Sequence, residues 1–588
     1  MSGSSVGGGA GSLSRYLPWL LCGVLALSGL LLWWASSSAW WLLLAGGGGL
    51  LFLQGIRDLR QTRHALLRNY PVSGWIRFVL ENFRPEIRQY FLESDTEELP
   101  FSRTQRAMVY QRAKSQNDKR PFGTIINLYQ TDVEWLTHSA QPVHADAATF
   151  RVRVGGPDCR QPYDCSVLNI SAMSFGSLSA NAIQALNRGA KLGNFAHDTG
   201  EGSISVHHRA HGGDLVWQIA SGYFGCRDAN GRFDAEKFAA NAVDPQVKMI
   251  EIKLSQGAKP GHGGMLPGAK VSAEIAAARG IPQGVDCISP PAHSAFDSPL
   301  TLIDFICRLR ELSGGKPVGI KLCIGHPWEW FGIAKAIRDR GVGPDFIVVD
   351  GSEGGTGAAP AEFSDHIGMP LRDGLRLVHN TLVGTGWRER IRVGASGKVV
   401  SAFDIAMMRA IGADWCNSAR GFMFALGCIQ SRSCHTDRCP TGVATQDALR
   451  QRALVVPDKA QRVWNFHRHT LEALAELISA AGLHHPQDLS ADHVMVRVSR
   501  GRSTPMSSLL PTVAPGCLLA GAALPMDTPK VFHAFWEAAL TERFGYQAAL
   551  CDPPPRMPAS VWAGKAGPAE AEALAAARPA PVATSTVG

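Results

Sequence analysis

The chain has 588 residues with a formal net charge of +8, and 45% of its residues are hydrophobic while 18% are charged. A chain of this length exceeds the size of a single core and predicts several structural parts. Its basic residues are scattered rather than grouped, which argues against nucleic-acid binding, and its 13 cysteines are too few for a secreted disulfide scaffold.

Two uncharged apolar segments predict a transmembrane hairpin over residues 16–56, after a flexible N-terminus at 1–15. Residues 17–35 are long enough to cross a hydrocarbon core of about 30 Å, and residues 39–56 form a shorter, glycine-rich return segment. A signal peptide is the alternative, but two apolar runs separated by serines do not fit one. Arginines precede and follow the hairpin while its turn has none, so both ends are expected in the cytoplasm.

Three further segments flank the predicted catalytic domain. Residues 57–145 have amphipathic arginine and leucine spacing, which predicts a helical connector. Residues 486–553 form a C-terminal extension, and residues 554–588 are rich in alanine and proline, which predicts a disordered tail.

Residues 146–485 alternate short β-rich runs with helical stretches, as expected for an α/β chain that folds as a (β/α)8 TIM barrel. The eight expected strands lie in "SVLNISAMSFGS", "FAHDTGEG", "KMIEIKLSQG", "GVDCISPP", "PVGIKLCIG", "DFIVVDGSEGG", "IRVGASGK" and "DWCNSARG". A doubly wound open sheet is the alternative, but no G-x-G-x-x-G follows the first strand. Because polar residues follow each strand core, the chemistry is expected at the carboxyl ends of the strands.

Two glycine-rich turns late in the barrel, "DGSEGGTG" and "VGASGK", predict a cofactor that carries a phosphate. Either turn by itself could be only a tight turn. Lys321 in "GIKLCIG" is expected at the barrel mouth, where a buried lysine needs an anionic partner. The N1/O2 edge of a reduced flavin is one such partner.

Three cysteines follow the last strand in "CIQSRSCHTDRCPTGVATQ", namely Cys428, Cys434 and Cys439. Tetrahedral zinc needs four ligands and would require one from outside this segment. An iron–sulfur cube that lacks one corner needs only three thiolates. Plain buried thiols are the third interpretation.

The motifs "SAMSFGSLS", "DTGEG", "EIKLSQGAKPG", "ISPP", "DGSEGGTGA" and the cysteine segment, taken in order, resemble the FMN-binding synthase domain of glutamate synthase. The chain is most similar to short, membrane-anchored bacterial members of that family. The resemblance implies a barrel with FMN and a 3Fe-4S cluster that converts 2-oxoglutarate through 2-iminoglutarate to L-glutamate. It also implies the bacterial inner membrane as the location, with a cytoplasmic catalytic domain.

The resemblance assigns roles to individual residues. For the substrate it implies Glu201, Gln256, Lys259 and Arg279, and for the cluster it implies Cys428, Cys434 and Cys439. For FMN it implies Met173, Ser174, Lys321, Gly354, Gly355, Thr356, Ser396 and Gly397. His262 and Met265 replace a glutamate and a glutamine of the large enzymes, which puts the identity of the substrate in doubt.

The resemblance also defines the expected partners. Large glutamate synthases begin with a glutamine amidotransferase domain, whereas this chain begins with the hairpin, so we expect free ammonia, an amine or a separate amidotransferase subunit. Electrons are expected from ferredoxin, a flavoprotein or a membrane redox partner, through the cluster to FMN and then as a hydride to the imine. Two rival functions are an amine transferase of the N-methylglutamate synthase type and a membrane-linked electron-transfer flavoprotein.

Overall fold

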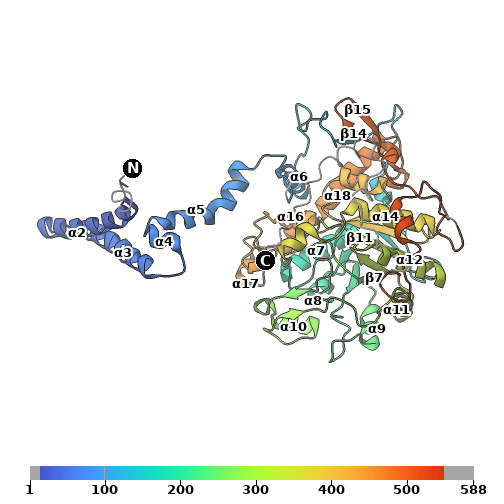
Figure 1. Ribbon diagram of the computed structural model, residues 1–588, viewed down its shortest axis with the longest axis horizontal. Helices are drawn as coiled ribbons and strands as arrows, with labels where there is room; N and C mark the ends of the chain where they lie inside the picture. The colour runs from blue at the N-terminus through green and yellow to red at the C-terminus, as the bar shows by residue number, and fades with distance from the viewer. Residues whose placement is uncertain (1–13, 98–99, 523, 548–588) are drawn as a thin grey trace, which may run out of the picture. The chain divides into compact units, whose positions relative to one another are not determined.

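The computed structural model describes residues 14–97, 100–522 and 524–547 (Figure 1). The chain divides into two compact units, Met1–Glu97 and Glu98–Gly588. The boundary between the units lies inside the predicted connector. Most of the predicted flexible N-terminus and the whole predicted tail at 554–588 lie outside the described residues.

The first unit contains two long apolar helices, α2 (Leu17–Ser36) and α3 (Trp40–Arg60). Glycine brings their backbones close together, because a Cβ at Gly48 would lie 2.7 Å from the backbone nitrogen of Ala26. Small residues are typical of such contacts between membrane helices. Both helices are long and apolar enough to cross a membrane, as expected for the hairpin.

A short helical segment follows the hairpin and is attached to its end by one buried carboxylate. It comprises α4 (Ala65–Asn69), α5 (Gly74–Ile87) and the π-helical turn η2 (Arg88–Leu92). The carboxylate of Asp58 accepts hydrogen bonds from Trp75 Nε1 and from the Val72 amide, each at 3.0 Å. Asp58 lies in the last turns of α3, so these bonds hold α5 against the end of α3.

The second unit contains a closed barrel of eight parallel strands, which confirms the predicted fold class. Around the barrel each strand pairs with its neighbours, and β13 closes onto β4. The strands are β4 (Leu168–Ile170), β5 (His197–Asp198), β6 (Leu215–Ile219), β7 (Val247–Lys253), β10 (Val318–Leu322), β11 (Phe346–Asp350), β12 (Arg392–Ser396) and β13 (Trp415–Ser418).

One of the eight expected strands is wrong. In "GVDCISPP", β9 (Cys287–Ile288) pairs antiparallel with β8 (Met265–Leu266) in a separate two-stranded sheet. The missing barrel strand is β6, "LVWQI", which is buried throughout and pairs with β5 and β7. A short apolar run followed by a turn has the same local pattern in either setting, so only the pairing distinguishes them.

Helices surround the barrel strands, as Figure 1 shows for α7, α11, α12 and α14 around β7 and β11. Several begin at serine caps, for example Ser179, whose hydroxyl accepts from the Ala182 amide at the start of α7. The helices are α7 (Ala180–Gly193), α8 (Val206–Arg209), α9 (Ala235–Ala242), α10 (Ala273–Arg279), α11 (Pro299–Leu312), α12 (Pro327–Arg340), α13 (Ala361–His366), α14 (Leu371–Gly384), α15 (Ala402–Ala410), α16 (Arg420–Leu426), α17 (Ala448–Arg452) and α18 (Val456–Ala480).

Segments outside the predicted barrel pack onto it. In the predicted connector, α6 (Arg103–Ala113) receives a hydrogen bond from Asn465 of α18 to the Ala113 carbonyl at 3.1 Å. Strand β1 of the connector pairs antiparallel with β14 of the predicted C-terminal extension, so the connector and the extension share one sheet. Apart from short 3-10 turns, the other elements are β1 (Glu134–Leu136), β2 (Arg151–Val154), β3 (Tyr163–Ser166), β14 (Val494–Ser499), β15 (Arg502–Pro505) and α19 (Lys530–Phe535).

Candidate active site

The predicted substrate residues gather at the carboxyl end of the barrel. Glu201 follows β5, Gln256 and Lys259 follow β7, and Arg279 ends α10 in the insertion between β7 and β10. These loops meet because neighbouring parallel strands end at the same edge of the barrel. The structure therefore brings all four residues into one region.

Lys253, the last residue of β7, links two of these side chains. Its ammonium donates to Glu201 Oε2 at 2.8 Å and to Gln256 Oε1 at 2.6 Å. Burial by itself would raise the pKa of Glu201, but the charges of Lys253, Arg279 and Lys259 lower it to about 2. Glu201 is therefore an ionised carboxylate surrounded by three cations.

Arg279 is buried against the loop that follows β4. Its guanidinium donates to the Phe175 carbonyl at 3.2 Å and lies over the ring of Phe224 at 5.1 Å. Its Nε is buried and has no hydrogen-bond partner among the residues that the structure describes. A buried donor without an acceptor is costly, so this nitrogen is suited to an anion bound at the site.

Glycines of the loops after β5 and β7 allow this close packing. A Cβ at Gly264 would lie 2.5 Å from Glu201 Oε1, and one at Gly202 would lie 3.1 Å from a guanidinium nitrogen of Arg279. The "DTGEG" and "PGHGG" segments therefore need glycine at these positions to surround the carboxylate and the guanidinium.

The two departures from the glutamate synthase pattern lie on the outside of the loop. The side chains of His262 and Met265 are both exposed. His262 contacts the ring of Phe363 edge-on at 5.5 Å and hydrogen-bonds the Gly263 carbonyl. Neither residue contributes to the buried charges around Glu201.

A second buried group of charges surrounds Lys321 on β10. Its ammonium lies 3.7 Å from Asp350 Oδ2, and Glu251 and Asp198 also act on it electrostatically. Burial and the neighbouring Glu251 raise the pKa of Asp198 well above its usual range, and these two carboxyls hydrogen-bond each other. Three carboxyls thus accompany one lysine, and burial raises the pKa of both Asp198 and Glu251.

The anionic partner expected for Lys321 is therefore supplied at least in part by the protein. Gln218 Nε2 donates to Glu251 Oε1 at 2.6 Å, and the Gly257 amide donates to Asp350 Oδ2 at 2.9 Å. The two bonds hold Glu251 and Asp350 in place inside the barrel.

The other residues expected at FMN lie on the surrounding loops. Met173 and Ser174 follow β4 and are buried, and Gly397 follows Ser396 at the end of β12. The hydroxyls of Ser171 and Ser396 are 3.2 Å apart, which joins the β4 and β12 ends. Gly354, Gly355 and Thr356 follow β11, and the last two are exposed. Backbone amides of such loops together with a buried lysine suit a flavin phosphate and ring.

The three cysteines approach one another after α16. Burial and the neighbouring thiols of Cys434 and Cys439 raise the pKa of Cys428 to about 12. Although burial opposes it, hydrogen bonds from Thr441 and nearby backbone amides lower the pKa of Cys439. Among the described residues, no three cysteine, histidine or carboxylate side chains form a ready-made metal site. The donor set of three neighbouring thiols suits an iron–sulfur cluster.

The cysteine loop packs directly on the glycine-rich loop after β11. A Cβ at Gly357 would lie 3.1 Å from the Cβ of Cys434. Arg420 of α16 lies between the two loops, because a Cβ at Gly355 would lie 2.5 Å from its guanidinium. On the other side, Lys270 Nζ donates to the Cys434 carbonyl at 2.9 Å.

Sequence reasoning missed several residues of the site. Lys253 lies within the quoted "EIKLSQG" motif and ends a strand, which was sufficient to single it out. Asp350 and Arg420 also stand at strand ends or directly after them. Asp198 ends β5 and begins the "DTGEG" motif, so the same signals mark it. Glu251 lies inside β7, and a carboxyl inside a barrel strand becomes informative only when its neighbours are known.

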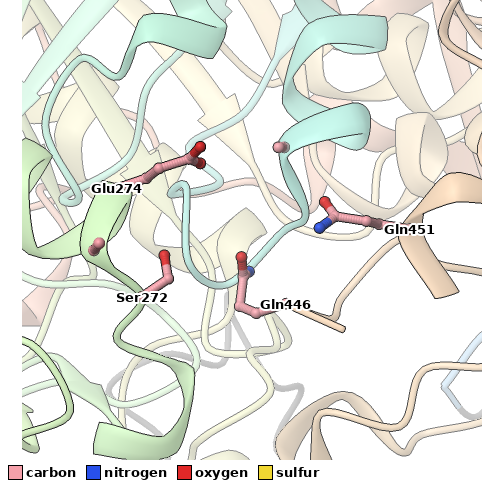
Figure 2. A pocket seen from close by; sticks show the side chains of 6 residues that line it. Ser272, Glu274, Gln446 and Gln451 are labelled. Atoms are coloured by element: carbon pink, nitrogen blue, oxygen red, sulfur yellow. The ribbon is translucent and has the colours of Figure 1, made fainter. Parts of the chain in front are cut away.

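A separate cavity of about 280 Å³ lies beside these loops (Figure 2). Ser272 and Glu274 line one side of it, and Gln446 and Gln451 approach from the cysteine segment and α17. Gln446 Nε2 donates to the Gly176 and Leu178 carbonyls at 3.1 and 3.0 Å. The final glutamine of "GVATQ" thus joins the cysteine segment to the loop after β4.

Comparison with known proteins agrees with this architecture. The family model described as the conserved region in glutamate synthase matches residues 157–484. The glutamate synthase large subunit-like protein YerD of Bacillus subtilis is 37% identical over 495 residues, covering 77% of this chain and 94% of YerD. An archaeal glutamate synthase (NADPH) of Methanocaldococcus jannaschii is 35% identical over 329 residues, which is 56% of this chain and 61% of that protein.

Among solved structures, a mutant flavocytochrome b2 with pyruvate bound superimposes with a TM-score of 0.38 and 11% identity, covering 71% of this chain and 85% of the other. The barrel is established by the strand pairing itself. The matched family region spans the barrel and the cysteine segment, and the chain therefore belongs to the glutamate synthase family and is an oxidoreductase enzyme.

Proposed function

We propose that this enzyme uses FMN and a 3Fe-4S cluster to reduce 2-iminoglutarate, formed from 2-oxoglutarate and ammonia, to L-glutamate. The observation that carries the proposal is the surplus of positive charge around Glu201, together with the unpartnered Nε of Arg279. A dicarboxylate substrate would supply the missing anions.

The residues of the site have distinct tasks in this reaction. Lys259 and Arg279 would bind the two carboxylates, while Lys253 fixes Glu201 and Gln256 through its hydrogen bonds. Because the pKa of Glu201 is lowered to about 2, its carboxylate stays ionised and stabilises a protonated imine rather than donating a proton. Burial lowers the pKa of Lys259, which makes its ammonium the better proton donor to the product nitrogen.

The cofactors would be held by the neighbouring groups. Lys321, Met173, Ser174, Ser396 and the turns around Gly354 and Gly397 would hold FMN, which supplies a hydride to the imine carbon when bound. Cys428, Cys434 and Cys439 would hold the 3Fe-4S cluster, which passes on single electrons. The packing of Gly357 on Cys434 supports a short route between the two.

The electrons and nitrogen come from outside the chain in this proposal. Ferredoxin, a flavoprotein or a membrane redox partner is the donor, and ammonia is free or delivered by an amidotransferase subunit. The helices α2 and α3 anchor the enzyme in a bacterial inner membrane, with Arg57 and Arg60 at the cytoplasmic end of α3.

An anaerobic assay tests the reaction. The purified full-length protein is reduced and mixed with 2-oxoglutarate and ammonium, and flavin reoxidation and glutamate are measured. We expect both to require both substrates. Glutamate formation from an amine donor without any reductant would instead favour an amine transferase.

Metal analysis tests the cluster separately. We expect about three iron atoms per chain, and a Cys434→Ser variant should lose iron and the visible absorbance of the cluster. Cys307→Ser, which changes a partly exposed cysteine outside the cysteine segment, is the control. Zinc in place of iron in the native protein would contradict the assignment.

A further inference from the structure

Helix α5 and the turn η2 present an uncovered apolar face. Ile76, Leu80, Phe83 and Ile87 are spaced three or four residues apart, so they share one side of the helix. Their exposed fractions are 62%, 57%, 55% and 40%, although each is a large apolar side chain. An apolar stripe of this length on a water-exposed helix needs a partner.

Charged side chains border this stripe. Arg77, Arg84 and Arg88 recur at the same helical spacing on the adjacent side. The two sides enclose a groove of about 870 Å³ that extends to Leu92 and Glu97. Arg77 pairs with Glu81, and Arg88 pairs with Glu97, both at the exposed edge of the groove. The groove therefore combines apolar walls with an edge of arginines and carboxylates.

The attachment of α5 limits what can occupy this groove. Asp58 accepts from Trp75 Nε1 and from the Val72 amide, so α5 begins at the end of the apolar helix α3. Arg57 and Arg60 lie in the same last turn of α3. An amphipathic helix held at the end of a membrane span, with arginines beside its apolar face, has the charge and polarity pattern of the membrane interface.

We propose that α5 and η2 lie in the membrane interface, with acyl chains against Ile76, Leu80 and Phe83 and anionic phospholipid headgroups at Arg77, Arg84 and Arg88. This inference rests on the membrane anchoring in the proposed function and extends it to a preference for anionic lipid. This amphipathic surface would attach the enzyme to the bilayer in addition to the hairpin.

Hydrogen exchange of the full-length protein in lipid nanodiscs tests this inference. One set of discs contains only phosphatidylcholine, and the other also contains phosphatidylglycerol. We expect amides of residues 74–92 to exchange several-fold more slowly in the anionic discs at low ionic strength, and the difference to shrink at high salt. Retention of the protein in neutral discs reports on the hairpin independently.

Two variants separate the contributions. R77Q/R84Q/R88Q should remove the difference between the two lipids, and I76S/L80S/F83S should speed exchange in both. R340Q/R462Q/R468Q, which removes the same charge from two exposed positions and one half-buried position on α12 and α18, is the matched control and should behave as the unaltered protein. Unchanged exchange in the barrel strands shows that each variant is folded.

Several outcomes would overturn the inference. Equal exchange of residues 74–92 in both lipids, or slow exchange that the arginine changes leave intact, would assign the face to a protein partner. Slow exchange that depends on protein concentration would assign it to a second copy. If neutral discs fail to retain the protein while anionic discs still slow exchange, the hairpin anchor fails and the interfacial helix stands.

Discussion

Two neighbouring groups of buried charges at the same end of one barrel have opposite ratios of cations to carboxyls. Around Glu201 one carboxylate meets the cations Lys253, Lys259 and Arg279, whereas around Lys321 one cation meets three carboxyls. In the first group the cations lower the pKa of Glu201 to about 2, and positive charge is left to spare for a bound anion. In the second, burial and the crowding of carboxyls raise the pKa values of Asp198 and Glu251. The same residue types thus leave positive charge free for a ligand in one place and surround a single lysine with carboxyls in the other.

The largest expected effect comes from removing the single carboxylate of the first group. Glu201→Gln should lower kcat/KM for imine reduction by about 10³-fold, because the positive imine loses its counter-charge. Flavin reoxidation by 2-oxoglutarate and ammonium measures it. Glu274→Gln, at an exposed carboxylate paired with His207, is the control and should be near the unaltered rate. A comparable loss in both variants would remove the special role of Glu201.

Removing the single cation of the second group should lower stability, in addition to the loss of its proposed contact with FMN. Lys321→Met leaves the ion pair with Asp350 broken and should cost about 3–5 kcal/mol of folding free energy. Denaturant unfolding measures this loss. Adding Asp350→Asn to the same chain should recover part of it, since the unpaired carboxylate is gone. No recovery in the double variant would show that the two groups do not interact.

The surplus cations of the first group should control substrate affinity. Lys259→Ala or Arg279→Ala should raise KM for 2-oxoglutarate by about 100-fold, because each removes a charge-assisted contact to a carboxylate. Steady-state kinetics over a range of 2-oxoglutarate concentrations provides the measurement. Lys237→Ala, at a solvent-exposed lysine paired with Asp234, is the matched control. An unchanged KM would indicate another kind of substrate.

The two groups should respond to pH with opposite signs. The raised pKa of Asp198 means that the folded protein loses stability as pH rises above the ordinary value of 3.8. Asp198→Asn should therefore increase the free energy of unfolding by about 1 kcal/mol at neutral pH. Below pH 3.8 it should have no effect, because the aspartate is then protonated in both the folded and the unfolded chain. Glu201 has a lowered pKa, so its contribution is present above 4.5 and is lost as pH falls towards about 2. Urea unfolding across a pH series checks both signs.

The smallest effect is expected outside both groups. The double change H262E/M265Q restores the residues of the large enzymes at two exposed positions and should alter kcat/KM by less than about twofold, since exposed charges are screened. The same reoxidation assay serves. A larger change in kcat/KM would mean that this loop contacts the substrate and that the substrate site extends beyond the charges around Glu201.

Much of the site was predictable because its residues lie in motifs with fixed spacing. The resemblance implies Glu201, Gln256, Lys259 and Arg279. The structure brings Lys259 and Arg279 near Glu201, and it adds Lys253, which sequence reasoning missed and which bonds Glu201 and Gln256. The barrel was predictable from alternating strands and helices, but "GVDCISPP" was assigned to it in place of "LVWQI". Local pattern specifies that a segment is extended and not which strand it pairs with.

The sequence by itself determined the fold class, the two apolar helices and the identity of the residues at the strand ends, because hydrophobic periodicity and glycine turns are local properties. Only the tertiary structure decided how the charges are grouped. Asp198, Glu251, Lys321 and Asp350 come from four different strands, and their protonation depends on distances across the barrel. It also decided that α5 is held at the end of α3 through Asp58, a contact that no periodic pattern encodes.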